Sequence, residues 1–134
     1  GVVVITAELG GGGYVEPEGL RLAEEGIRRF LHHIGILGEA PTPSRDHLRL
    51  MKVESAAAYV LAPEDGIFEP CVTLGSQVQV GMFAGWIHSP DTPWRASTPV
   101  YFRAAGSVVC QRAVCATRRG DCLFQVLAEY SALH

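Results

Sequence analysis

Glu8 has the sequence position most suggestive of catalytic chemistry. It follows a run of mostly β-branched apolar residues, Val2–Ala7, and precedes four consecutive glycines, Gly10–Gly13. The apolar run predicts a strand buried on both faces, and open α/β sheets place their active sites at the carboxyl ends of strands. Glu8 is therefore a candidate catalytic carboxylate. The alternative is a solvated strand end followed by a loose loop.

The glycine run is the second candidate feature. Glycine allows another group to approach the backbone closely, and it also permits a sharp turn with positive φ. Four adjacent glycines lose considerable conformational entropy on folding, which favours a role in shaping a site over a merely flexible connection. Gly10 and Gly11 are accordingly candidates for substrate binding beside Glu8.

A helix is expected directly after the glycines. Pro17 suits a first helical turn, and the carboxylates before and after it complement the helix dipole. Apolar residues recur at three- and four-residue spacing, as in an amphipathic helix: Leu20, Ala23, Ile27, Phe30, Leu31 and Ile34. Gly35 and Gly38 are stop signals. Strand, glycine loop and helix are therefore predicted to form one unit, residues 1–40. Because one helix cannot cover both faces of a buried strand, we expect this unit to belong to a larger α/β domain.

The chain changes character after this unit. Residues 41–52 contain a polar, proline-rich connector and are predicted to be a linker. From residue 53 to 134 short apolar runs alternate with turn residues, and a weak internal repeat is visible. Gly66 and Gly81 are spaced much as Gly106 and Gly120 are, and each copy is expected to be three strands joined by two glycine turns. Two such copies related by a pseudo-twofold axis predict a small all-β domain.

Composition excludes several functions. The formal charge of −3 over 134 residues gives no basic face for nucleic acid, and no apolar run could cross a membrane. No signal-peptide pattern is present, so a cytoplasmic location is expected. None of the four cysteines forms a C-x-x-C pair, and they are expected to be small buried residues in a reducing compartment: Cys71, Cys110, Cys115 and Cys122.

The β layout resembles the barrel-sandwich hybrid of biotinyl and lipoyl carrier domains. Such carriers present a lysine on the hairpin between the two copies. The corresponding segment in this chain, residues 88–99, contains none, and the only lysine, Lys52, precedes the first copy. The resemblance therefore implies a structural or gating module rather than a carrier. Trp94 and Arg95, within that segment, are candidates for the mouth of a neighbouring active site.

Taken together, three segments resemble the C-terminal portion of the succinylglutamate desuccinylase/aspartoacylase family: residues 5–13, 28–37 and 62–68. The resemblance implies the end of a carboxypeptidase-like α/β domain followed by the barrel-sandwich domain. It further implies a zinc-dependent hydrolase that cleaves the amide or ester bond of N-acylated amino acids or similar small molecules. In that mechanism a carboxylate takes a proton from the attacking water and passes it to the leaving amine, and the resemblance gives this role to Glu8.

The zinc ligands of that family are an H-x-x-E pair and a distant histidine. No histidine of this chain has a glutamate at the required distance: His32, His33, His47, His88 and His134. We therefore expect a fragment that does not bind catalytic zinc or turn over substrate alone, and whose exposed Val2–Ala7 edge promotes self-association or association with the missing part. The rival hypothesis is a non-enzymatic biotinyl-like β module that docks onto a partner chain.

Overall fold

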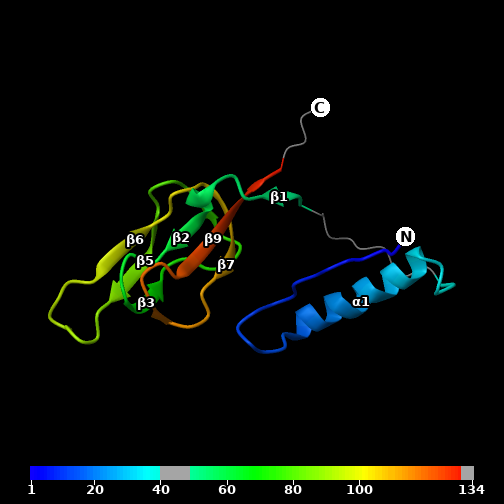
Figure 1. Ribbon diagram of the computed structural model, residues 1–134, viewed down its shortest axis with the longest axis horizontal. Coiled ribbons are helices and arrows are strands. Elements are labelled where there is room, and N and C mark those ends of the chain that lie inside the picture. Colours follow the sequence, from blue (N-terminus) through cyan, green and yellow to red (C-terminus); the bar gives the residue numbers. More distant parts are fainter. Residues whose placement is uncertain (40–48, 131–134) are drawn as a thin grey trace. The chain divides into compact units, whose positions relative to one another are not determined.

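The computed structural model describes residues 1–39 and 49–130 (Figure 1). The chain divides into two compact units, residues 1–47 and 48–134. The predicted linker, residues 41–52, lies mostly outside the described residues, so the predicted boundary stays a prediction. None of the helices in the described ranges combines the length and apolarity that a bilayer crossing requires.

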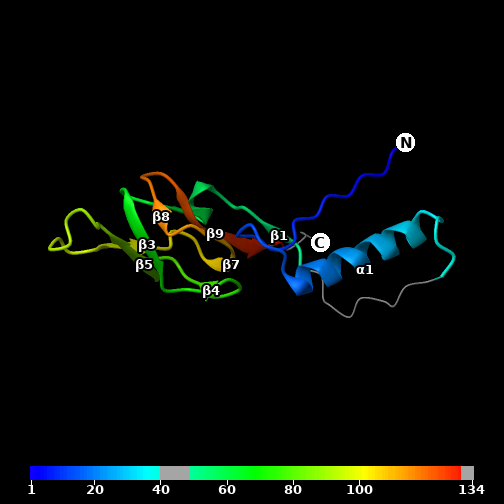
Figure 2. The same cartoon turned by 90° about the horizontal axis from the view of Figure 1, so that it is seen from below.

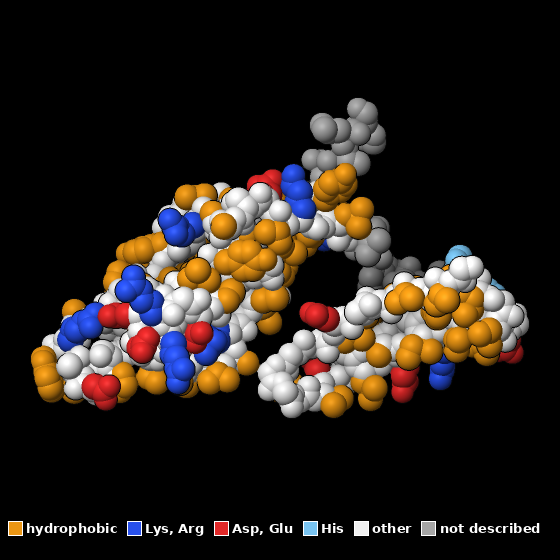
Figure 3. All heavy atoms as spheres, in the orientation of Figure 1, with side chains coloured by type: hydrophobic (Ala, Val, Ile, Leu, Met, Phe, Trp, Pro, Cys, Tyr) orange, Lys and Arg blue, Asp and Glu red, His pale blue; other side chains and the backbone are white. Residues whose placement is uncertain are grey.

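The first unit is built around the predicted helix. Helix α1 spans Pro17–His33 and has proline in its first turn and two histidines in its last. The backbone N–H of Ile34 still donates to the Phe30 carbonyl, and Gly35 then adopts a φ of 79°, which ends the helix. The sequence prediction of this helix is thus confirmed. Apolar side chains gather on the surface of this unit (Figure 3), among them the half-exposed Leu20 and Ile27.

The buried strand predicted for Val2–Ala7 does not form, and this prediction is wrong. These residues have no strand partner, and their side chains are exposed, Val2 by 91% and Ile5 by 69%. A strand exists only where its backbone groups are hydrogen-bonded to a neighbouring strand. No described segment pairs with residues 2–7, so the α/β layer expected for this unit consists of the helix alone.

The second unit is all β apart from one short helical turn. Its elements are β1 (Met51–Lys52), the 3₁₀ turn η1 (Ala56–Ala58), β2 (Tyr59–Leu61), β3 (Gly66–Pro70), β4 (Gln77–Val78), β5 (Phe83–His88), β6 (Thr98–Tyr101), β7 (Gly106–Gln111), β8 (Ala116–Thr117) and β9 (Cys122–Glu129). One sheet has the order β6-β5-β3-β8. The other runs β1-β9-β7-β4, with β2 also paired to β9. All pairings are antiparallel.

The internal repeat appears in space as an exchange of short strands. Strand β4 of the first copy pairs with β7 of the second, and β8 of the second pairs with β3 of the first. The glycine turns obey the same symmetry, since the Gly81 N–H donates to the Phe102 carbonyl over 2.8 Å and the Gly120 N–H to that of Ala62 over 2.9 Å. Figure 2 shows β4 and β8 beside their exchanged partners. The repeat predicted from the sequence is confirmed.

The core lies between the two sheets. The Phe124 ring, from β9, contacts Phe68 edge-on with centroids 5.5 Å apart and Phe102 at 5.3 Å. All three side chains are buried, and full burial of such a ring stabilises the fold by about 2–3 kcal/mol. The core therefore draws residues from both sheets and from both copies.

The cysteine prediction requires correction. All four thiols are free, and the residues are exposed rather than buried. Cys110 and Cys122 lie at strand positions open to solvent, and Cys71 and Cys115 lie in turns, so the core is filled by larger apolar side chains instead. Partial burial raises the pKa of the Cys122 thiol.

Gly106 illustrates how tightly the strands approach. Its φ is +144°, and a Cβ added there would overlap the carbonyl oxygen of Leu127 on β9. We predict that Gly106→Ala lowers the free energy of unfolding by about 3 kcal/mol, measured by urea denaturation. Gly120→Ala is the matched control: φ is +90° but the surrounding space is open, so its cost should stay near 1 kcal/mol. Equal costs would contradict the close-approach explanation.

Glu64 anchors the β5–β6 hairpin. Nη2 of Arg95 donates to its two carboxylate oxygens over 2.8 and 2.6 Å, and the Thr98 hydroxyl donates to it as well. These hydrogen bonds, the one from Thr98 first, lower the pKa of Glu64. A lowered folded-state pKa gives stability that is present above the unfolded pKa and lost as pH falls through the folded one.

We therefore predict that Glu64→Gln lowers the melting temperature at pH 7 and that the difference from wild type shrinks as the pH falls below about 4. Thr98→Val should reduce the same pH-dependent difference, since it removes the largest cause of the shift. A melting-temperature difference that is constant between pH 7 and pH 3 would refute this account.

Candidate functional site

The glycine loop has a defined conformation. Gly10, Gly12 and Gly13 have φ of 84°, 70° and 80°, a region that residues with a side chain rarely adopt. Gly11 has no positive φ, and a Cβ there would meet no atom within 4 Å. The backbone conformation therefore favours glycine at three of the four positions. The expectation that the glycines give the loop a defined shape holds better for Gly10 than for Gly11.

The loop folds back on the start of helix α1. A Cβ added at Gly19, the one buried residue of α1, would lie 3.5 Å from the Leu9 carbonyl oxygen. One added at Gly10 would lie 3.7 Å from Glu16 Oε2. Leu9 thus lies close to Gly19, and Gly10 close to Glu16, so the segment after Glu8 lies against the first helical turn.

Glu8 itself is exposed. Within the part of the chain that the structure describes, no residue donates a hydrogen bond to its carboxylate or forms an ion pair with it. An unengaged carboxylate can accept a proton from a bound water or substrate. The role given to Glu8 by the family resemblance is neither supported nor opposed by other contacts, and it stays a prediction.

Glu16 is a residue of this loop that the sequence pattern does not assign to the site. The pattern predicts only that it complements the helix dipole, yet its carboxylate lies against Gly10 and its side chain makes no capping hydrogen bond to α1. Two carboxylates, Glu8 and Glu16, therefore flank the same glycine loop. The sequence feature that could have indicated this position of Glu16 is the Glu16-Pro17 pair at the start of the helix. It marks the point at which the chain leaves the glycine loop and enters α1.

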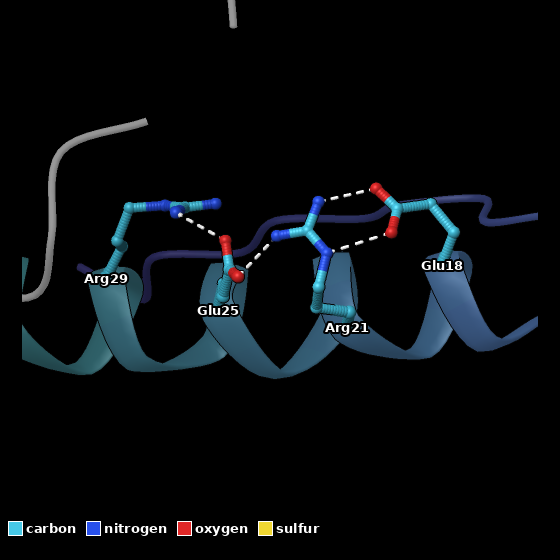
Figure 4. Close-up of polar contacts among 4 residues, drawn as sticks. All are labelled: Glu18, Arg21, Glu25 and Arg29. Carbon is cyan, nitrogen blue, oxygen red and sulfur yellow. Dashed lines mark hydrogen bonds and ion pairs between the residues drawn. The ribbon is translucent and has the colours of Figure 1, made fainter. Parts of the chain in front are cut away.

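The exposed face of α1 is held by ion pairs rather than by packing. Arg21 lies between Glu18 and Glu25, with nitrogen–oxygen distances of 2.5 Å, and Arg29 extends the row from Glu25 at 3.4 Å (Figure 4). The hydrogen bond from Arg21 lowers the pKa of both glutamates and, in return, the two carboxylates raise that of Arg21. Glu18 and Glu25 are thereby engaged, whereas Glu8 and Glu16 are not part of this row.

The described histidines do not supply a metal centre. In residues 1–39 and 49–130, no group of three or more histidine, cysteine, aspartate or glutamate side chains is arranged to hold a metal ion. Nδ1 of His32 lies 3.1 Å from the Leu37 carbonyl oxygen, a contact that ties the helix end to the following turn. His47 and His134 lie outside the described residues. The residues within the two described ranges therefore do not fit the zinc site that the family resemblance implies.

Comparison with known proteins identifies relatives of the whole chain. No family model matches the sequence. An N-alpha-acetyl-L-2,4-diaminobutyric acid deacetylase from Halomonas elongata is 33% identical over 132 residues, which cover 96% of this chain and 37% of that protein.

Solved structures of similar proteins also match most of the chain. A succinylglutamate desuccinylase/aspartoacylase from Rhodobacter sphaeroides is 37% identical with a TM-score of 0.84, covering 92% of this chain and 39% of its own. The product-bound ectoine utilization protein EutE (DoeB) from Ruegeria pomeroyi is 27% identical with a TM-score of 0.82, covering 90% and 36%.

The match is to the C-terminal part of the desuccinylase/aspartoacylase fold. The chain belongs to the succinylglutamate desuccinylase/aspartoacylase family, as its sequence resemblance predicted. It spans less than two fifths of the length of these relatives.

The glycine loop makes a prediction of its own. Gly10→Ala should strain the positive-φ turn by about 1 kcal/mol and loosen its contact with the helix start, so amides in the first turn of α1 should exchange about fivefold faster. Hydrogen exchange followed by NMR measures this. Gly11→Ala, where φ is not positive, is the control and should leave the rates unchanged. Equal acceleration in both variants would show that the turn does not depend on Gly10.

Proposed function

We propose that this chain is part of a hydrolase that cleaves the amide bond of N-acylated amino acids, and that Glu8 is its proton-transfer carboxylate. The observation that carries the proposal is family membership: relatives matched over nine tenths or more of the chain are named as a deacetylase and a desuccinylase/aspartoacylase. The role of Glu8 in this proposal comes from the sequence resemblance, and Glu8 lies two residues before the positive-φ turn at Gly10.

The chemistry required of Glu8 is specific. As water attacks the acyl carbon, the carboxylate accepts a water proton. It then donates this proton to the nitrogen of the amine as the carbon–nitrogen bond breaks. Such a group must keep a fixed position relative to the scissile bond. We propose that the close approach of Leu9 to Gly19 and of Gly10 to Glu16 provides this fixed position.

The amide substrate also needs a zinc site and a binding site for its charged groups. We propose that zinc, which the family resemblance implies, is held by residues outside this chain, and that this chain alone is inactive toward such amides. A reading frame that continues upstream of Gly1 into an H-x-x-E segment would support this. If none exists, the docking-module alternative gains, with a partner chain providing the rest of the site.

The β unit takes a supporting role in this proposal. The exchanged strands β4 and β8 are consistent with the barrel-sandwich interpretation, and the absence of lysine from residues 88–99 argues against a carrier. We propose that it is a structural or gating module beside the catalytic part. The substrate class suggested by the relatives' names is a small N-acetyl or N-succinyl amino acid.

The test is Glu8→Gln in the longest protein that the gene encodes, assayed with N-acetyl-2,4-diaminobutyrate, N-succinylglutamate and N-acetylaspartate. Loss of a general acid–base group typically costs 10²–10⁴-fold, so we expect kcat to fall by at least about 100-fold. Bound zinc, measured by mass spectrometry, should be unchanged.

Glu16→Gln is the matched control, because this second carboxylate flanks the same loop. It should change kcat by less than about threefold, which is far below the loss of a proton-transfer group. Full turnover by Glu8→Gln would remove Glu8 from the mechanism. Equal losses in both variants would instead indicate that the loop needs negative charge rather than a specific base.

A further inference from the structure

Three polar side chains lie next to one another on the sheet formed by β6, β5, β3 and β8. Glu69 on β3 pairs across the strands with Trp86 on β5, and His88 lies two residues further along β5, on the same face. Ile87 pairs with Thr98 on β6, so Ser97 lies opposite His88. The register of the sheet therefore brings Ser97, His88 and Glu69 together from three separate segments.

Hydrogen bonds join these side chains in a fixed order. Ser97 Oγ lies 2.7 Å from His88 Nδ1, and His88 Nε2 lies 2.5 Å from Glu69 Oε2. An ionised carboxylate can only accept, so a neutral imidazole must donate from Nε2 to Glu69. Nδ1 then carries the lone pair and accepts the proton of the Ser97 hydroxyl. The order is hydroxyl, imidazole, carboxylate.

This is the arrangement that activates a serine nucleophile: a base within reach of the hydroxyl, oriented by a third group. The ring nitrogens are used in the reverse sense from the serine-protease arrangement, with Nδ1 facing the serine. We propose that Ser97 is a nucleophile that accepts acyl groups from activated esters, with His88 as its base and Glu69 as the positioning residue. These three residues belong to the second compact unit and Glu8 to the first, and the proposal does not rest on the function proposed above.

The acylation step balances without a cofactor. Ser97 Oγ forms a bond to the ester carbonyl carbon while its proton moves to His88 Nδ1, and Glu69 stabilises the resulting imidazolium. The carbon–oxygen bond to the alcohol portion breaks, and the leaving oxygen departs with the electron pair. Because a phenolate leaves without a proton, His88 first releases the proton taken from Ser97 to solvent. The neutral imidazole then accepts a proton at Nδ1 from a water that attacks the acyl-serine, and returns it to Ser97 Oγ as the carbon–oxygen bond to Ser97 breaks and the carboxylic acid leaves.

The surroundings define the class of ester. The side chains of His88 and Glu69 are 41% and 59% exposed, so water competes and the base is only moderately effective. A leaving group that needs no proton, such as a phenolate, is therefore required. Trp86 adjoins His88 on this face, and its ring lies 4.9 Å from that of Phe83, which in turn contacts Tyr101 at 5.8 Å. These rings offer an apolar surface for an aryl ester of a short acid.

The test uses p-nitrophenyl acetate and the 134-residue chain, with its four exposed cysteines first blocked by iodoacetamide and a chelator present throughout. We expect release of nitrophenolate and an adduct of one acetyl group on Ser97, located by peptide mapping after an acid quench. Background acetylation of amines is confined to the N-terminus and Lys52, because the chain has no other lysine.

The variants separate the roles. Ser97→Ala should abolish the adduct, and His88→Gln should slow acetylation by at least about tenfold. Glu69→Gln should slow it as well, whereas Glu69→Asp, which retains a carboxylate, should restore part of the rate. Ser89→Ala is the matched control: this serine lies on the same hairpin, but its hydroxyl contacts only Thr92 among the described residues, so labelling of Ser97 should be unchanged.

Acetylation of Ser97 that depends on His88 and Glu69 supports the proposal. An unmodified Ser97 in the folded wild-type chain overturns it, and so does labelling of Ser89 and Ser97 at equal rates. Circular dichroism of each variant confirms that the sheet is intact. Glu8→Gln should leave the acetylation of Ser97 unchanged. The proposal for Ser97 and the proposal for amide hydrolysis by Glu8 are therefore tested independently of each other.

Discussion

The β unit depends on the mutual exchange of two very short strands. Strands β4 and β8 each contribute only two residues, and each completes the sheet of the opposite copy. Two backbone pairs are too few to hold a strand by themselves. They persist because the turns beside them are also hydrogen-bonded across the copies, Gly81 to Phe102 and Gly120 to Ala62. Packing of Phe68, Phe102 and Phe124 then becomes possible, since the exchange fixes the spacing of the two sheets.

This constraint also explains which glycines are indispensable. Gly66 and Gly106 occupy equivalent places in the two copies, and at each a Cβ would overlap a carbonyl oxygen of the neighbouring strand, His88 or Leu127. Gly75 and Gly120 instead meet open space and serve only the turn conformation. In both copies, a neighbouring strand thus comes too close for a side chain at the same position. This explains why glycine recurs there in the internal repeat of the sequence.

Local signals in the sequence predicted most of the fold. Helix α1 was readable because Pro17, Gly35 and the apolar spacing agree, and the β repeat because its glycines recur. The Val2–Ala7 strand failed because its formation depends on hydrogen-bonding partners that no described segment provides. The prediction that the cysteines are buried failed for a similar reason. A cysteine can lie in the core or at the surface, and its position in the strand or turn determines which. At the candidate site, Glu8 and Gly10 were named from the sequence and their roles stay predictions, whereas the proximity of Glu16 to Gly10 is visible only in the folded loop. The Ser97–His88–Glu69 chain depends on strand register, which single-sequence patterns do not specify.

The exchange of strands has a consequence for how such a domain can vary. Each copy needs a strand from the other to complete its sheet. A single copy would therefore have to obtain that strand from another chain, and neither copy can be lost without the other. The segment between them, residues 89–97, takes no part in the exchange. It is held instead by side chains at its base, Glu64 with Arg95 and His88 with Ser97. The length and composition of residues 89–94 can therefore change without disturbing the sheets, whereas Arg95 and Ser97 hold the base of the segment. Among the described residues of this unit, the most exposed aromatic residue, Trp94, lies in that variable part.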